Sequence, residues 1–147
     1  MKIFGHPLHM MLIHFPTALL PMDVFLSFFA YYNMDSTLLP AAFFCMAGGV
    51  LTGLVAILTG LIDLLLIPKN ERPALATAII HGFINATVLL FFGIFVYRSW
   101  QEYPDFNMPQ MSMLVIKSVL IIVLFGGNYL GGKLIFHHHI GIKNPEA

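Results

Sequence analysis

The chain has 147 residues, of which 59% are hydrophobic and only 10% are charged, and its formal net charge is zero. A soluble domain of this length could not bury so much apolar side-chain surface, because its surface-to-volume ratio is too high. The composition therefore predicts an integral membrane protein with a single domain, 1–147, and it gives no indication of nucleic-acid binding.

Four apolar segments are each long enough to cross about 30 Å of hydrocarbon as a helix. They lie at about 7–32, 38–67, 73–100 and 108–136, with turn-forming residues between them. Backbone polar groups in lipid must be paired within the segment, so each segment is predicted to be a helix. The short loops favour an all-α, up-down four-helix bundle with both termini on the same side of the membrane.

The first segment begins with three histidines, His6, His9 and His14. His6 and His9 are three residues apart and therefore share one face of a helix. Pro16 and Pro21 remove backbone donors, so the helix is predicted to bend just after His14. At about 1.5 Å per residue, His14 would lie roughly 10 Å inside the helix.

The second segment carries a pair of glycines at a spacing of four residues and one acid. Gly49 and Gly53 are four residues apart, which would let another backbone or a flat ring approach closely. Asp63 lies near the end of the segment, at about the depth of the histidines. It could accept a ring N–H from one of them, or it could reach outward to Lys69 or Arg72. The sequence leaves both alternatives open.

The third segment contains His81, roughly 12 Å inside the helix and so at the depth predicted for His14. Two neutral imidazoles that face each other across a bundle form the ligand geometry of a bis-histidine haem. The alternative is two separate core histidines, each with its own hydrogen bond. Asn85 follows His81 by one helical turn and could steady it or a ligand.

The fourth segment contains a lysine that matches an acid in the first. Asp23 and Lys117 would each lie roughly 13 Å from the face opposite the histidines. Either charge alone would be costly in lipid, so the sequence predicts a buried ion pair that joins the two helices. A structural role is favoured over proton conduction. Gly127 and Gly131 repeat the four-residue glycine spacing of the second segment.

Three further histidines, His137, His138 and His139, follow the fourth segment. One of them could fold back toward His9 and form a second pair, or they could remain solvated at the membrane surface. Basic residues gather on the side of the termini: Lys2, Lys69, Arg72, Lys133 and Lys143. This bias predicts a cytoplasmic (inner) membrane protein with both termini in the cytoplasm.

Three stretches carry a resemblance to a known family. Residues 5–16 read GHPLHMMLIHFP, residues 59–63 read TGLID, and residues 131–142 read GGKLIFHHHIGI. Together with His81 and Asn85, they resemble the bacterial membrane family called domain of unknown function 2231, over nearly the whole chain. Met10 stands where that family has a proline.

The resemblance also implies which histidines matter. His137 and His139 stand where the family has an arginine and a glycine, so that His138 takes the family's histidine position. Family members are sometimes fused to Rieske-type or cytochrome c domains, which implies an electron-transfer setting. The best ligand candidates are then His9, His14, His81 and His138, and His6, Asp63 and Asn85 would support them.

These observations predict a small b-type cytochrome-like subunit that holds one or two haem b groups by histidine pairs. It would relay electrons to or from quinone or a redox partner subunit within a larger membrane complex, rather than act as an enzyme by itself. Two alternatives remain: a structural or assembly subunit without a cofactor, and a histidine-lined site for zinc, copper or non-haem iron.

Overall fold

The computed structural model describes residues 2–3 and 6–138. Two short antiparallel strands, β1 (Lys2–Ile3) and β2 (His6–Pro7), precede the helices. The helices are α1 (Leu8–Leu12), α2 (His14–Asn33), the 3-10 turn η1 (Ser36–Leu38), α3 (Leu39–Leu65), α4 (Arg72–Trp100) and α5 (Met111–Phe136).

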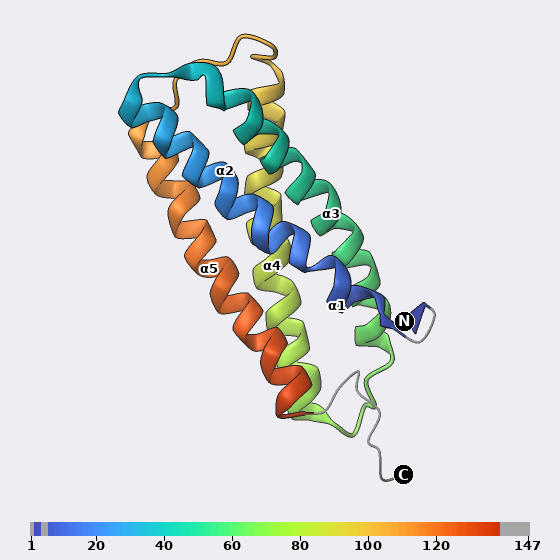
Figure 1. Ribbon diagram of the computed structural model, residues 1–147. Helices are drawn as coiled ribbons and strands as arrows, with labels where there is room; N and C mark the ends of the chain where they lie inside the picture. The colour runs from blue at the N-terminus through green and yellow to red at the C-terminus, as the bar shows by residue number, and fades with distance from the viewer. Residues whose placement is uncertain (1, 4–5, 139–147) are drawn as a thin grey trace.

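The prediction of an all-α chain with four apolar spans is confirmed. The spans are Leu8–Asn33, Ser36–Leu65, Arg72–Trp100 and Met111–Phe136. Large apolar side chains are exposed on all four, as a lipid-facing surface requires. Successive spans run in opposite directions (Figure 1), so the start of α1 and the end of α5 lie at one end of the bundle, here called the histidine end. The opposite end, which carries η1, is called the η1 end.

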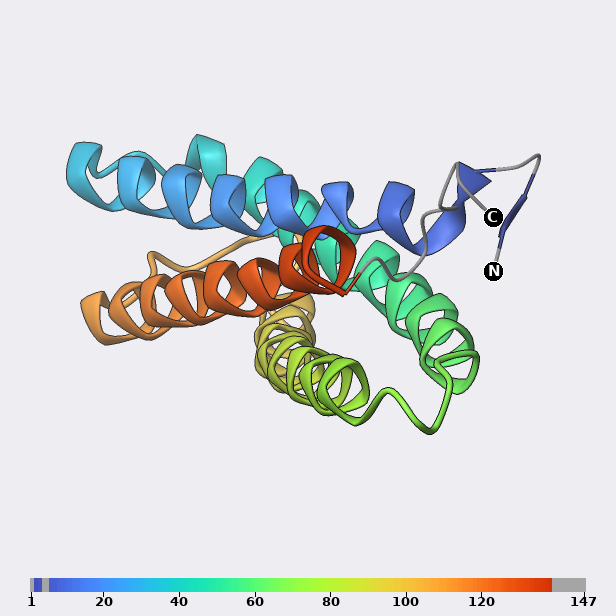
Figure 2. The same cartoon turned by 90° about the horizontal axis from the view of Figure 1, so that it is seen from below.

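The helices form a ring in chain order. α2 packs against α3 and α5, and α4 packs against the same two helices, while α1 packs against α3. Figure 2 shows α3 and α4 separating toward the loop that joins them at the histidine end. The centre of the ring is filled by ten buried apolar side chains: Leu20, Val24, Phe43, Met46, Val50, Val88, Leu89, Phe92, Ile121 and Leu124.

A single turn residue, Ile13, separates α1 from α2. Pro16 has no backbone N–H to offer the carbonyl of Leu12, and its ring crowds that carbonyl, so the regular helix is interrupted one turn earlier. The interruption lies at Ile13, and helical hydrogen bonds continue on both sides of it, from the Ile13 N–H to His9 and from the Thr17 N–H to Ile13. The bend expected just after His14 stays a prediction. Pro21 lies inside α2 and does not end it.

Two glycines of α3 allow close packing with both neighbouring helices. A Cβ on Gly49 would lie 2.7 Å from Leu20 of α2, and one on Gly53 would lie 2.6 Å from Leu89 of α4. Side chains of two helices therefore reach the α3 backbone at successive turns. Ordinary helix packing accounts for this predicted glycine pair.

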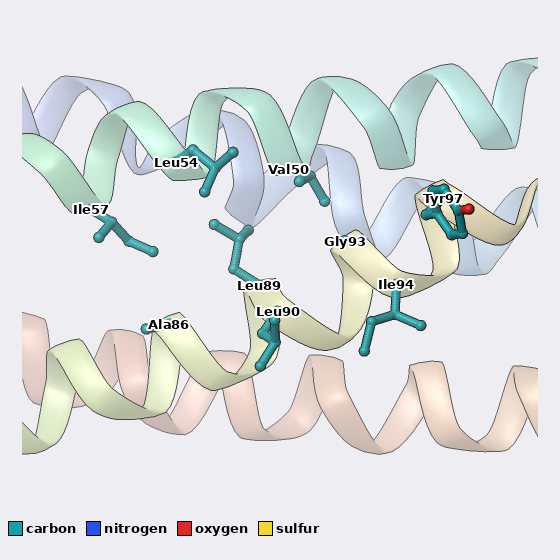
Figure 3. Close-up of a pocket in the computed structure, with 9 residues that line it drawn as sticks. All are labelled: Val50, Leu54, Ile57, Ala86, Leu89, Leu90, Gly93, Ile94 and Tyr97. Carbon is teal, nitrogen blue, oxygen red and sulfur yellow. The ribbon is translucent and has the colours of Figure 1, made fainter. Parts of the chain in front are cut away.

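An apolar groove of about 450 Å³ runs along the outer face between α3 and α4. Figure 3 shows its lining from α3, including Leu54, and from α4, including Leu90 and Tyr97. Because these three side chains are exposed, the groove faces the lipid. Its lining offers one polar side-chain group, the hydroxyl of Tyr97.

The loop before η1 is held by a carboxylate cap. The side chain of Asp35 accepts a hydrogen bond from the backbone N–H of Thr37 at 2.9 Å. This bond favours the ionised form and lowers the pKa of the exposed Asp35 carboxyl below its ordinary value. The cap therefore stabilises the folded loop at neutral pH, and its contribution is lost as the pH falls through the lowered pKa.

An NMR titration in detergent micelles is expected to give Asp35 a lower pKa than the same residue has in a short unfolded peptide. The Thr37→Pro variant lacks the donor N–H and should move the pKa back toward the peptide value. Equal pKa values in the intact protein and the peptide would show that the cap does not form.

Candidate functional site

Two histidines from different helices face each other inside the histidine end of the bundle. The ring centroids of His9 in α1 and His81 in α4 are 6.3 Å apart, and the ring planes are nearly perpendicular at 86°. Both side chains are partly buried. The fold therefore brings together two imidazoles that lie 72 residues apart in the sequence.

The ring of His9 is fixed by the backbone of α3. Its Nδ1 lies 2.8 Å from the carbonyl oxygen of Ala56, and because a carbonyl only accepts, Nδ1 carries the hydrogen. The ring also lies against Gly60, where a Cβ would be 2.9 Å from Cε1 of His9. Gly60 therefore provides the space that the ring occupies.

The ring of His81 is fixed in the same way by α5. Its Nδ1 donates to the carbonyl of Gly127 at 2.7 Å, and a Cβ on Gly131 would lie 2.8 Å from Cε1. The side-chain amide of Asn85 donates to the His81 carbonyl at 2.8 Å. The amide nitrogen is also 3.1 Å from Nδ1, but two donors cannot bond to each other, so we assign the bond to the carbonyl.

The two halves of the site thus repeat one arrangement. In each helical hairpin a histidine of the first helix donates to a carbonyl of the second and lies on the glycine four residues further along. Both rings are then the Nδ1–H tautomer, and Nε2 carries the free lone pair. Within residues 8–138, neither Nε2 has a hydrogen-bond partner. Metal-binding histidines commonly donate their other ring nitrogen to a carbonyl in this way.

His14 does not face His81, contrary to the expectation from depth. Its ring is exposed, and its Nδ1 contacts the carbonyl of Met11, 3.2 Å away in the preceding turn. His9 takes the inner position instead. Five residues separate His9 and His14, so the two rings point to different faces of the span.

His138 is half-buried just beyond the end of α5, and its ring centroid is 4.9 Å from that of the exposed His137. Its Nε2 is buried and has no hydrogen-bond partner within the described part of the chain. No ring contact between His138 and His9 is found there either. His139 lies outside the described residues.

Asp63 and His6 are two of the residues that the sequence analysis expects to support the histidine ligands. Asp63 is half-buried on α3, three residues after Gly60 and on the same face of the helix. The side chain of His6 lies outside the description. Among residues 2–3 and 6–138, no group of three or more His, Cys, Asp or Glu side chains is placed to hold a metal ion. The assignments as haem ligands stay predictions.

The structure places Asp23 and Lys117 in direct contact toward the η1 end. Lys117 Nζ donates to both carboxylate oxygens of Asp23, at 3.0 and 2.9 Å, and Ser27 Oγ donates to one of them at 3.2 Å. Asp23 is only 1% exposed and Lys117 4%. The pair joins α2 to α5 inside the bundle.

Sequence reasoning missed the backbone acceptors of the site. Nothing in the residue types of Ala56 and Gly127 marks their carbonyls as histidine partners. The glycines Gly60 and Gly131 were visible as small residues in the spans, and each stands four residues after one of those acceptors. A histidine on one helix and a glycine at the same depth on the neighbouring helix form a pattern that could have indicated these ring–glycine contacts.

Comparison with known proteins gives one match. The family model described as "Predicted membrane protein (DUF2231)" matches residues 5–144. None of the curated proteins and none of the solved structures matches the chain.

Proposed function

The chain belongs to the DUF2231 family of predicted membrane proteins, and we propose that it is a b-type cytochrome-like subunit of the membrane in which His9 and His81 would hold one haem. The observation that carries the proposal is the convergence of these two rings, with centroids 6.3 Å apart. Two imidazoles that bind one metal ion through nitrogen at about 2 Å have centroids roughly 6 Å apart.

The number of ligands favours haem over a small ion. Haem iron takes its protein ligands in the two axial positions, because the porphyrin fills the other four. Zinc sites commonly need three or four protein ligands. Among the side chains that the structure describes, the site presents a pair of imidazoles, each with Nδ1–H donated to a helix carbonyl. This pairing suits axial ligation, and a small ion held by two histidines is the second candidate.

A haem bound there would supply one-electron transfer. The chain's own part is to hold each ring in one tautomer, with Ala56 and Gly127 as the acceptors. Gly60 and Gly131 leave the space that the rings need. The apolar side chains of the bundle around the half-buried rings would lower the local dielectric constant.

Electron exchange would take place with a redox partner subunit or a quinone in the bilayer. The basic residues Lys69, Arg72 and Lys133 all lie at the histidine end. By the positive-inside rule this end would face the cytoplasm, so that the site lies in the cytoplasmic half of the membrane. Of the four ligand candidates, only His9 and His81 are in ring contact among the described residues, so the proposal is for one haem and does not include His14 or His138 as its ligands.

The test is an absorption spectrum of the purified, detergent-solubilised protein produced with an adequate haem supply. A reduced-minus-oxidised difference spectrum with b-type bands is expected. His9→Ala and His81→Ala should each reduce haem content to background, because each removes one axial ligand.

His14→Ala is the matched control, since it removes a histidine from the same span whose ring is exposed. It should leave the haem content unchanged. Metal analysis of the same samples separates the second candidate, which predicts bound zinc, copper or iron without b-type bands. Wild-type haem content in the His9→Ala and His81→Ala variants would contradict the ligand assignment.

A further inference from the structure

A polar pocket opens at the η1 end, remote from the histidine site. Its volume is about 460 Å³, and residues from α2, α3, α4, α5 and the loop before α5 line it. Its rim carries exposed polar side chains: Arg98, Glu102, Asn107, Gln110 and Ser112. The pocket therefore begins in the aqueous or headgroup region and extends into the bundle.

The inner end of the pocket is the Asp23–Lys117 ion pair, with Ser27 beside it. Charged side chains inside a span are costly, and in membrane proteins they commonly mark ion or proton pathways. A purely structural pair needs no polar access from outside. Here the pair and the polar rim residues line one pocket, whose walls also include apolar side chains such as Phe43 and Met46. The pocket therefore leads from the rim toward the pair.

Beyond the pair the polar surface stops. Leu20 lies one turn from Asp23, and Ile121 lies one turn from Lys117; both belong to the buried apolar cluster. Toward the histidine end, the next side-chain hydrogen bond between helices in the described part of the chain is that from Asn128 to Thr17, at 3.1 Å. Thr17 is six residues from Asp23, roughly 9 Å along the helix. The pair is therefore reachable from one end of the bundle.

We propose that the pocket is a water-filled vestibule through which the Asp23–Lys117 pair exchanges a proton with the aqueous phase at the η1 end. The ligand is hydronium: its proton passes to a carboxylate oxygen of Asp23, water remains in the pocket, and Lys117 keeps its charge. The reverse step returns the proton to water, so no oxidant or reductant is needed.

The other groups at the pair make the exchange possible. Lys117 Nζ lies 5.8 Å from the centre of the Phe95 ring, which is a second partner for the ammonium when the carboxyl becomes neutral. Ser27 can donate to the same carboxyl in either state. These contacts keep both side chains in place through the transfer.

Besides the pair itself, two charged side chains line the pocket. One is on α4 and the other lies just after the end of α4. Arg98 and Glu102 line the pocket, and Glu102 accepts the backbone N–H of Asn107 at 3.1 Å. The loop before α5 contributes no ionisable lining side chain besides Glu102, the lining residues of α3 carry none, and α2 and α5 contribute only Asp23 and Lys117. Cys45 of α3 does not line the pocket, but its thiol is close enough to Asp23 to interact with it electrostatically. Arg98 and Glu102 have opposite charges, so the rim neither concentrates nor repels hydronium strongly.

Thiol labelling tests access to the pair. Ser27→Cys is introduced with Cys45→Ala, which removes the native cysteine, and vesicles are treated with a charged, membrane-impermeant thiol reagent from either side. Labelling from the η1 side is expected, at a rate at least about tenfold above that of Ser118→Cys, because a thiolate forms in water and not in an apolar contact.

Ser118 is the matched control because it lies next to Lys117, at the same depth, and does not line the pocket. Failure to label Ser27→Cys in folded protein would overturn the vestibule. Equal labelling from both sides would overturn its one-sided access.

Infrared difference spectroscopy tests the exchange itself in otherwise unchanged protein. As the pH on the η1 side is lowered within the range of the folded state, the carbonyl stretch of a protonated carboxyl is expected to appear. This band should be missing in Asp23→Asn. A band that stays absent, or that follows the pH at the histidine end, would overturn the proposal, whatever the outcome of the haem measurements.

Discussion

Lys117→Met is expected to lower the free energy of unfolding by about 3–5 kcal/mol, because it leaves the Asp23 carboxylate buried without its cation. Asp23 is 1% exposed and accepts two bonds from Lys117 Nζ. Methionine has a similar length, so the loss reports the charge rather than a cavity. Unfolding of the detergent-solubilised protein by SDS titration measures the change.

The double variant Asp23→Leu, Lys117→Met provides the control. It removes both charges and should recover most of the loss, since an apolar pair of similar volume replaces a buried ion pair at little cost. A loss below about 1 kcal/mol in the single variant would mean that the pair behaves as an exposed salt bridge, and burial of the pair would be wrong.

Gly131→Ala is expected to displace the ring of His81. The new Cβ would lie 2.8 Å from Cε1 and 3.2 Å from Nδ1, so the ring must move. The movement strains or breaks the bond from Nδ1 to the Gly127 carbonyl, and a fully lost bond that leaves a buried polar group unpaired costs about 1–3 kcal/mol. A displaced His81 ring would no longer hold the proposed haem.

Gly132→Ala is the matched control, because a Cβ at Gly132 meets no atom within 4 Å. The ring nitrogen signals of His81 in an NMR spectrum report its Nδ1–H tautomer, and haem content reports ligation. Both should change in Gly131→Ala and stay as in the wild type in Gly132→Ala. Identical His81 signals in the two variants would contradict the close contact.

Much of the fold could be predicted because the bilayer imposes simple lengths. The observed helices end within three residues of the segments predicted from hydropathy. The Asp23–Lys117 ion pair was also predicted correctly. Both residues lie in uninterrupted helices, where the depth of a residue along the helix axis follows from its number.

The histidine pairing could not be predicted by the same count. Depth alone favoured His14 opposite His81, but depth gives no information about the face on which a residue lies. His9 and His14 are five residues apart, which is about 140° around a helix, so they lie on different faces, and His9 is the one that faces His81. The backbone acceptors depend on which helices are neighbours, and that is a tertiary property.

The two polar contacts have a shared mechanical consequence. His9 and Asp23 belong to the first helical hairpin, and their partners His81 and Lys117 belong to the second. The bond from Asn128 of α5 to Thr17 of α2 lies between them along the first span, and apolar side chains of both hairpins pack around all three contacts. Polar contacts spread over 14 residues of the first span therefore hold the tilt of one hairpin against the other.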